Sequence, residues 1–249
     1  MIEEIIKLYK EKTAKECYRI EIEDGYPDIM DDKIGGIPYF PIGEEYPTDR
    51  NNNPMILLIQ INLKNIKLEN YPQEGILEIF IDRECSWPCD YKVKYFKKIT
   101  ENQQDLKEIN MKNYIYEKPL KIRLKKDIEH MPISNYNSFN LMREAIKELA
   151  KVEVDDIEKF FEENGRDFYT ELDGLNVFPG NIGGYADFTQ MDPRPIKGAE
   201  DTTECLIKID SNLGNGIMIG DSGIIFSFIS KDDIKSENFE KAIVDWDCY

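Results

Sequence analysis

The chain begins with two successive patterns of apolar and charged positions. Apolar residues recur at helical spacing among charged ones, at Ile2, Ile5, Ile6, Leu8 and Tyr9, which predicts an amphipathic helix packed by one face. Residues 17–23 then alternate between apolar and charged side chains, a pattern typical of a half-buried strand. The N-terminus is therefore predicted to form a helix that leads into a sheet.

Several later apolar blocks occur twice with one constant offset. Gly35 and Gly183 are 148 positions apart (183 − 35), and the apolar runs that follow keep this offset without gaps. Agreement of glycines and hydrophobic residues in separate blocks favours a duplicated unit over coincidence. The matching blocks are 34–36 with 182–184, 58–62 with 206–210, 75–76 with 223–224, and 80–81 with 228–229.

Both copies predict the same local structure. A Gly-Gly turn precedes an apolar strand, and a turn closed by a glycine leads to a second strand. The two strands are close enough in sequence to pair antiparallel. Residues 91–96 alternate like a further strand, and their counterpart under the same offset lies near residues 241–244. We expect repeat units at approximately residues 33–96 and 181–244.

The segment between these units mixes strand and helix patterns. Residues 114–116 and 120–124 resemble strands, whereas residues 139–151 and 155–164 have helical spacing of apolar side chains. The apolar stripes need burial, so we expect this insert to pack across the sheets. The predicted fold class is α+β: two related, mostly antiparallel β-sheet units produced by internal duplication, with an N-terminal helix and a helical insert. One domain is expected to span residues 1–249.

The net negative charge of the chain makes one class of partner, nucleic acid, an unfavourable one. The chain has 49 acidic and 32 basic residues, a formal net charge of −17, and nucleic-acid binding normally requires a basic face. We therefore expect no nucleic-acid partner. The negative charge has two interpretations, solubility and steering towards a basic protein partner, and composition does not separate them.

Targeting and redox patterns point to the cytoplasm. The start of the chain lacks a basic segment followed by an apolar one, and no stretch approaches the roughly 20 apolar residues of a membrane span. We expect a cytoplasmic protein without a membrane partner. Five cysteines at irregular spacing favour reduced thiols over a disulfide framework. Cys85 and Cys89 have three residues between them, which is not the spacing of a thioredoxin-type pair.

Motifs for catalysis are incomplete. Residues 220–223 read Gly-Asp-Ser-Gly and resemble the nucleophile turn of chymotrypsin-like proteases, with His130 upstream. The 148-residue offset instead aligns Ser222 with Glu74 in a predicted hairpin turn, so a nucleophile is not expected. Residues 210–221 only weakly resemble a calcium loop, and no cysteine pair has the spacing of a zinc site. We assign no catalytic residue, metal or cofactor, and whether the protein is an enzyme stays open.

Two loops supply candidate binding residues. After the second Gly-Gly turn, Gln190, Asp192 and Arg194 place an amide, a carboxylate and a guanidinium in a proline-stiffened loop. Arg194 has the planar fork that recognises carboxylate or phosphate, although Asp192 and Arg194 pairing with each other to hold the loop is the preferred interpretation. The corresponding first loop contains Tyr39 and Tyr46. We predict that the two loops line one ligand-binding cleft between the units.

Six segments in this order, residues 35–41, 58–62, 75–81, 183–185, 190–194 and 245–248, carry a family resemblance. Together they resemble the YwqG-like family. That resemblance implies a bacterial protein with an α+β fold, no established catalytic residue, cofactor or substrate, and genes sometimes found near secreted-toxin loci. An immunity or interaction role towards a basic toxin would fit this association. One departure is Tyr46 before Pro47, where many relatives have Trp.

Two functions remain open from the sequence. One is a non-enzymatic protein-interaction module, immunity- or antitoxin-like, that binds a basic partner. The other is a small-ligand or carbohydrate-binding protein, or a carboxylate-based enzyme, that uses the cleft between the units.

Overall fold

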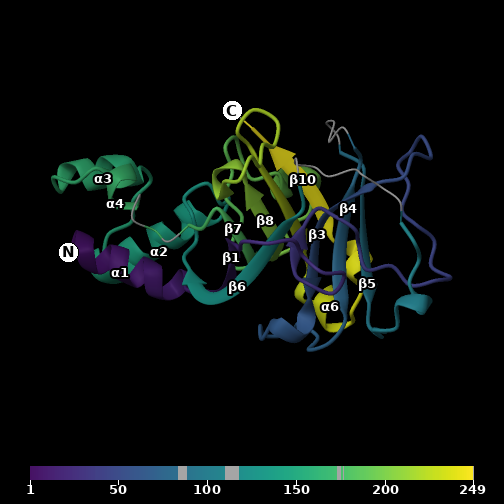
Figure 1. Cartoon of the computed structure of the whole chain (residues 1–249). Coiled ribbons are helices and arrows are strands. Elements are labelled where there is room, and N and C mark those ends of the chain that lie inside the picture. The colour runs from purple at the N-terminus through teal and green to yellow at the C-terminus, as the bar shows by residue number, and fades with distance from the viewer. Residues whose placement is uncertain (84–88, 110–117, 173–174, 176, 249) are drawn as a thin grey trace.

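A computed structural model describes residues 1–83, 89–109, 118–172, 175 and 177–248 (Figure 1). In this part of the chain, ten strands form one antiparallel sheet in the order β10-β9-β8-β7-β1-β6-β2-β3-β4-β5. The strands are β1 (Lys15–Ile22), β2 (Lys33–Ile34), β3 (Ile56–Asn62), β4 (Ile76–Ile81), β5 (Tyr91–Phe96), β6 (Leu120–Glu129), β7 (Gly180–Gly183), β8 (Glu204–Asp210), β9 (Ile224–Ile229) and β10 (Ile243–Asp247).

The strand order is symmetric about its centre. β1 and β6 pair along eight positions, from Lys15 opposite Glu129 to Ile22 opposite Ile122. β1 also pairs with β7 of the second half, and β6 also pairs with β2 of the first half. Either edge of the sheet is therefore built from four strands of one half.

The predicted strand pairs are confirmed. β3 pairs antiparallel with β4, β8 pairs antiparallel with β9, and both members of the second pair begin 148 residues after their counterparts (204 − 56 and 224 − 76). Irregularities follow Leu57 in β3 and Cys205 in β8, again at the same offset. Gly36 and Gly184 both have positive φ, 87° and 65°, as expected for equivalent turns.

The offset fails at the last strand of each half. The expected counterpart of β5, near residues 241–244, is only partly a strand, because residues 239–241 form the 3₁₀ helix η4 (Phe239–Lys241). β10 consequently begins at Ile243, 152 positions after Tyr91 (243 − 91). The two edges of the sheet therefore differ in structure.

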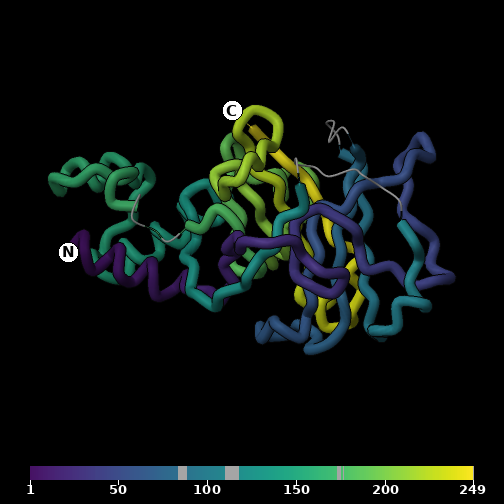
Figure 2. The backbone as a smooth tube through the Cα atoms, in the orientation of Figure 1, coloured from purple at the N-terminus to yellow at the C-terminus, as the bar shows by residue number. Residues whose placement is uncertain are grey.

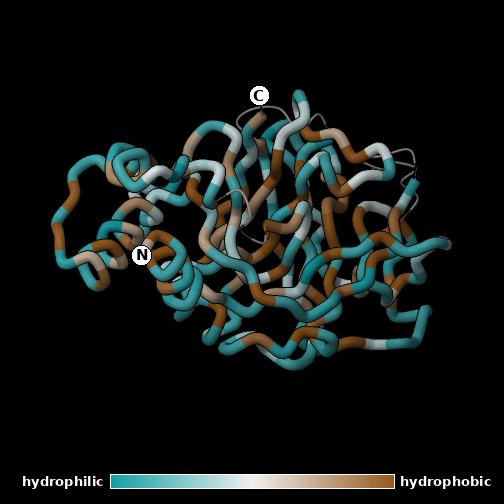
Figure 3. The backbone as a smooth tube through the Cα atoms, turned by 90° about the vertical axis from the view of Figure 1, so that its left-hand side faces the viewer, coloured by the Kyte–Doolittle hydropathy of each residue, from teal (hydrophilic) through white to brown (hydrophobic). Residues whose placement is uncertain are grey.

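The sheet curls into a near-barrel around one apolar core. Val93 of β5 and Val244 of β10 belong to the same buried cluster, although their strands are the two ends of the order. Tyr95 contacts Phe239 with ring centroids 5.0 Å apart, and Lys97 forms an ion pair with Glu237 at 2.8 Å. Figure 2 shows the C-terminal segment beside β5, and Figure 3 shows hydrophobic stretches gathered in the interior of the larger part of the molecule.

The N-terminal helix and the helices of the insert form a separate cluster beside one end of the sheet, which corrects the expectation that the insert packs across it (Figure 1). The N-terminal helix supplies the apolar partner that the insert needs, and the Tyr9 hydroxyl donates to the Met131 carbonyl at 2.9 Å. The prediction for residues 114–116 lies outside the described residues. The helices are α1 (Ile2–Thr13), α2 (Ser138–Ala150), α3 (Ile157–Glu163), α4 (Phe168–Leu172), α5 (Arg194–Lys197) and α6 (Lys231–Lys235), with 3₁₀ helices η1 (Leu63–Asn65), η2 (Gln103–Asp105) and η3 (Ser211–Leu213) in addition to η4.

Among the described helices, none is long and apolar enough to span a membrane. The cytoplasmic location stays a prediction.

Candidate functional site

β5 is one edge of the described sheet, and the backbone groups on its outer side pair with no described strand. The Asp82 amide donates to the Asp90 carbonyl at 2.9 Å, and hydrogen-bonded pairs recur at every second position of an antiparallel ladder. The register therefore directs the backbone amides and carbonyls of the even-numbered residues of β5 towards β4. Tyr91 and Val93 direct their amides and carbonyls the other way, where no described strand pairs with them.

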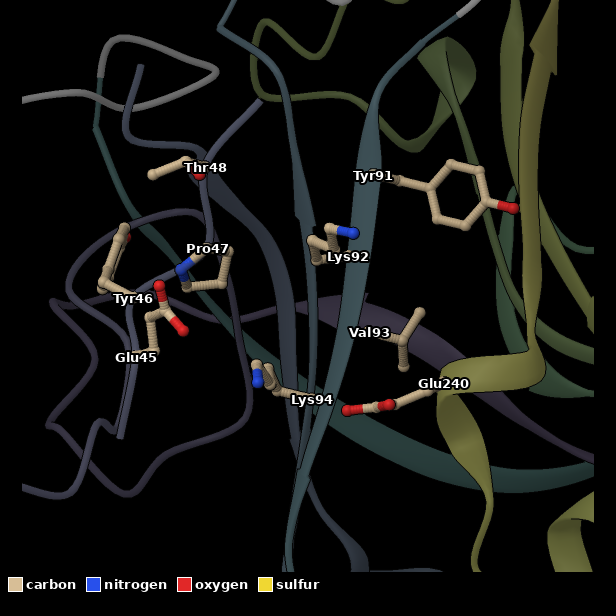
Figure 4. Close-up of a pocket in the computed structure, with 9 residues that line it drawn as sticks. All are labelled: Glu45, Tyr46, Pro47, Thr48, Tyr91, Lys92, Val93, Lys94 and Glu240. Atoms are coloured by element: carbon tan, nitrogen blue, oxygen red, sulfur yellow. The ribbon is translucent and has the colours of Figure 1, made fainter. Parts of the chain in front are cut away.

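A pocket of about 560 Å³ lies beside this free edge. In Figure 4, Tyr91 and Val93 point from β5 towards the side of Glu240, which belongs to η4. Lys92 and Lys94 point to the opposite side, towards the loop of residues 45–48. The pocket is lined by Glu45, Tyr46, Pro47, Thr48, Tyr91, Lys92, Val93, Lys94 and Glu240.

The loop wall of the pocket is held by aromatic packing. The Tyr46 ring lies 5.0 Å from the Phe40 ring and 5.6 Å from the Phe80 ring, measured between centroids. Its hydroxyl donates to the Met55 carbonyl at 3.2 Å. Each aromatic pair contributes roughly 0.5–1.5 kcal/mol beyond area burial, so this wall is formed before any ligand arrives.

The two lysines of the edge strand form no ion pair with a described residue, although Lys92 is close enough to Asp90 to help lower the pKa of that carboxyl group. Lys92 is exposed and Lys94 is half-buried, and neither ammonium group forms an ion pair with a described carboxylate. Lys97, at the end of the same segment, is by contrast paired with Glu237 at 2.8 Å. The pocket therefore presents two positive groups beside free backbone donors and acceptors.

A buried carboxyl group lies beneath the pocket wall. Glu78 of β4 is opposite both Gln60 of β3 and Lys94 of β5, and neither carboxyl oxygen has a hydrogen-bond partner among the described residues. Burial raises the pKa of Glu78 well above its usual value. Burial also lowers the pKa of Lys33, which is opposite Gln60, to about 8. These shifts favour the neutral form of each group.

Of the two first-loop residues predicted to bind a ligand, only Tyr46 lines this pocket. Tyr39 is fully buried. Its amide donates to Gln60 Oε1 at 2.8 Å, and its hydroxyl accepts from the Thr100 amide at 2.8 Å. The structure thus brings Tyr39 and Tyr46 together around Phe40, with different surroundings for their hydroxyl groups.

The second-loop residues lie at another place on the sheet. Arg194 donates to Asp192 through Nε at 3.0 Å and through Nη2 at 2.6 Å, and both side chains are buried. The guanidinium carbon lies 4.3 Å from the centroid of Phe228 on β9. The exposed Gln190 donates its side-chain amide to the Cys248 carbonyl at 2.8 Å. The contacts of Arg194 support the loop-holding interpretation, and the ligand role of the five predicted residues stays a prediction.

The Gly-Asp-Ser-Gly segment forms a turn before β9. Ser222 has a φ of 57°, and its hydroxyl contacts Met218 Sδ at 3.9 Å. His130 Nδ1 is hydrogen-bonded to the Lys10 carbonyl at 3.0 Å. Ser222 therefore lies in a turn before a strand, as predicted, and the hydrogen bonds of Ser222 and His130 go to other residues.

Among the described cysteines, the thiols of Cys17, Cys205 and Cys248 form no disulfide. Burial is the main reason why the pKa of Cys17 and of Cys205 rises to about 12, so both are poor nucleophiles at neutral pH. Cys85 lies outside the described residues. In the described ranges, no group of three or more His, Cys, Asp or Glu side chains is arranged to hold a metal ion.

The free edge was not recognised from the sequence, although one signal was present. Lys92 and Lys94 alternate with apolar residues in a short strand, and lysines on a strand are a common feature of sheet edges.

One family model matches residues 32–248, and its description is a domain of unknown function (DUF1963). No curated protein matches the chain.

Proposed function

The chain belongs to the DUF1963 family, a domain family whose description leaves function open, and from this premise we propose that it is a non-enzymatic protein-interaction module. It binds an extended segment of a partner protein along β5. The observation that carries the proposal is the outer side of β5, where Tyr91 and Val93 pair with no described strand, beside a pocket of about 560 Å³.

Strand addition uses the groups that this edge supplies. Main-chain hydrogen bonds to an exposed sheet edge give affinity, and pockets for alternate side chains give specificity. Tyr91 and Val93 supply donors and acceptors on the outer side of β5. The wall containing Tyr46 and the side containing Glu240 supply surroundings for the side chains of the added strand.

A second copy of this chain is a poor occupant of the edge. Antiparallel pairing of two β5 strands about a two-fold axis at Val93 places Lys92 of each copy opposite Lys94 of the other. Like charges directly opposite each other destabilise a sheet. The lysines thus oppose self-association of β5 in this register.

The net charge of −17 supports a partner of basic overall charge. The immunity-like role implied by the resemblance to YwqG-like proteins fits the same charge. A basic carrier protein that displays a β5-binding segment should associate more slowly as salt is raised, because salt screens the long-range attraction. An association rate independent of salt argues against the basic partner.

The repeated architecture is also part of the proposal. We infer that the two halves descend from one duplicated unit, which is supported by the symmetric strand order and by equal offsets at β3 and β8 and at β4 and β9.

Small-ligand binding is the second candidate function. A pocket of about 230 Å³ is lined by residues 68–71 of the first half and by Gly183, Glu204 and Lys231 of the second. The Tyr71 hydroxyl is buried there without a hydrogen-bond partner among the described residues. A thermal-shift screen with sugars and nucleotides tests this function. A hit that persists unchanged in Tyr71→Phe assigns the ligand to another place.

Selection from a random peptide library tests the strand-addition function. Peptides enriched on the wild-type protein should lose binding to Val93→Pro, which removes an outward-facing amide of β5. Hydrogen exchange at Tyr91 and Val93 should slow when a selected peptide binds. Selected peptides that bind Val93→Pro equally well, or that protect only other amides, refute the proposal.

A further inference from the structure

We propose that the segment bound along β5 carries carboxylates at the two positions opposite Lys92 and Lys94, with apolar side chains at the intervening positions. This inference rests on the proposed strand-addition function and specifies the chemistry of the partner segment.

Alternation along β5 separates the two kinds of neighbour. Side chains of an added strand lie on the same sheet face as the β5 residues opposite them. Positions opposite Lys92 and Lys94 therefore face the loop of residues 45–48, and positions opposite Tyr91 and Val93 face the side of Glu240 (Figure 4).

The hydrogen-bond phase places the lysines in the closer type of pair. Because Tyr91 and Val93 direct their backbone groups to the free side, they form the hydrogen-bonded pairs with an added strand. Lys92 and Lys94 fall in the non-hydrogen-bonded pairs, where opposite Cα atoms are only about 4.5 Å apart. Cross-strand charge pairs act most strongly at this shorter separation.

Local charge then favours carboxylates on the loop side. Lys92 and Lys94 lack ion-pair partners among the described residues, and the pocket wall opposite them contributes one carboxylate, that of Glu45. Two ammonium groups and one carboxylate leave a net positive charge on this side. A partner segment with lysines at the positions opposite Lys92 and Lys94 is repelled by their ammonium groups.

The other side favours apolar side chains. Val93 is buried in the central core, and Tyr91 packs against that core. Glu240 is the charged residue that lines this side of the pocket, so a carboxylate here meets a like charge. The two sides together predict alternation of acidic and apolar residues, and not a uniformly acidic segment.

Three matched eight-residue peptides test the inference. All have the same apolar residues at alternate positions. The remaining four positions share the face that carries Lys92 and Lys94. The first peptide has Glu at the two central positions of this face and Lys at the two flanking positions, and the second has the reverse charges. The third has Thr at all four positions. Each has zero net charge when its termini are blocked, which removes long-range repulsion by the acidic chain.

Binding to the wild-type protein should rank the Glu peptide above the Thr peptide, and the Thr peptide above the Lys peptide, with about tenfold between the first two at low salt. The double variant Lys92→Glu/Lys94→Glu should reverse the order of the Glu and Lys peptides, with circular dichroism confirming that it remains folded. Raised salt should compress the differences in both proteins.

The possible failures are distinguishable. If the three peptides bind equally and lose binding to Val93→Pro, strand addition stands and the acidic preference is overturned. If the preference exists but survives Val93→Pro, the lysines act outside a strand-addition site, and both the inference and the proposed function are overturned. Absence of binding by all three, together with no peptide selected from the random library, has the same consequence.

Discussion

Lys94 of β5 and Glu78 of β4 lie directly opposite each other, one lining the pocket and the other fully buried beneath its wall. The ammonium group forms no ion pair with a described carboxylate, and Glu78 has no hydrogen-bond partner among the described residues. The neighbouring strands thus supply an accessible charge for a partner and a buried carboxyl group that destabilises the fold when it ionises.

Replacing this carboxyl group should change the pH dependence of stability. Because burial raises the pKa of Glu78, the folded protein holds the proton more tightly than the unfolded chain does. Stability from this group is full below the unfolded value of 4.5 and is lost as pH rises towards the folded pKa. Glu78→Gln should raise the free energy of unfolding at pH 8 by about 1–2 kcal/mol. Urea denaturation at pH 5 and pH 8 measures the effect.

Glu240→Gln is the matched control, because Glu240 is exposed. A loss of stability between pH 5 and pH 8 that is equal in wild type and Glu78→Gln would place the responsible group elsewhere.

Proline substitutions along β5 should reveal which amides face outward. Lys94→Pro removes an amide directed at β4 and should cost about 3 kcal/mol of unfolding free energy. Val93→Pro removes only an outward amide, so its cost should be close to that of Val93→Ala, which accounts for the lost side-chain packing. Denaturant titration compares the three variants. Equal losses for the two prolines would contradict the register.

The buried pair of Asp192 and Arg194 should be structural. Arg194→Met alone should cost about 3–5 kcal/mol, because it leaves the buried Asp192 carboxylate without its partner. The double variant Asp192→Leu/Arg194→Met should recover most of that loss. Chemical denaturation of the single and double variants gives the coupling energy. Near-neutral single variants would instead favour the ligand role predicted for Arg194.

Gly184 should tolerate no side chain. A Cβ atom there would overlap Glu129 Oε2 and lie 2.9 Å from Cys17 Cβ, so Gly184→Ala should cost more than about 3 kcal/mol. Gly43 also has positive φ, 97°, but open space around it, and Gly43→Ala should cost only about 1 kcal/mol of backbone strain. Thermal unfolding of the two variants separates contact from strain. Similar losses would show that backbone conformation dominates at both sites.

Much of the local structure follows from the sequence alone. The helix at Ile2–Thr13 and the strand pairs β3–β4 and β8–β9 were predictable, because helical spacing, dense apolar runs and glycine turns act over a few neighbouring residues. The 148-residue offset likewise predicted corresponding strands at residues 58–62 and 206–210, and the observed strands begin two residues earlier in both halves, at Ile56 and Glu204.

The site depended on contacts between distant segments. The alternation of residues 91–96 predicts a strand, but periodicity does not specify whether a second strand pairs with Tyr91 and Val93. Arg194 similarly had a ligand and a structural interpretation until its packing against Phe228, 34 residues later (228 − 194), was known. Glu78 is buried because the segment containing Tyr39 and Tyr46 covers its face of the sheet. Hydrogen bonding and burial between segments far apart in the chain are set by tertiary packing, and local sequence preferences contain no information about which distant segment will be the neighbour.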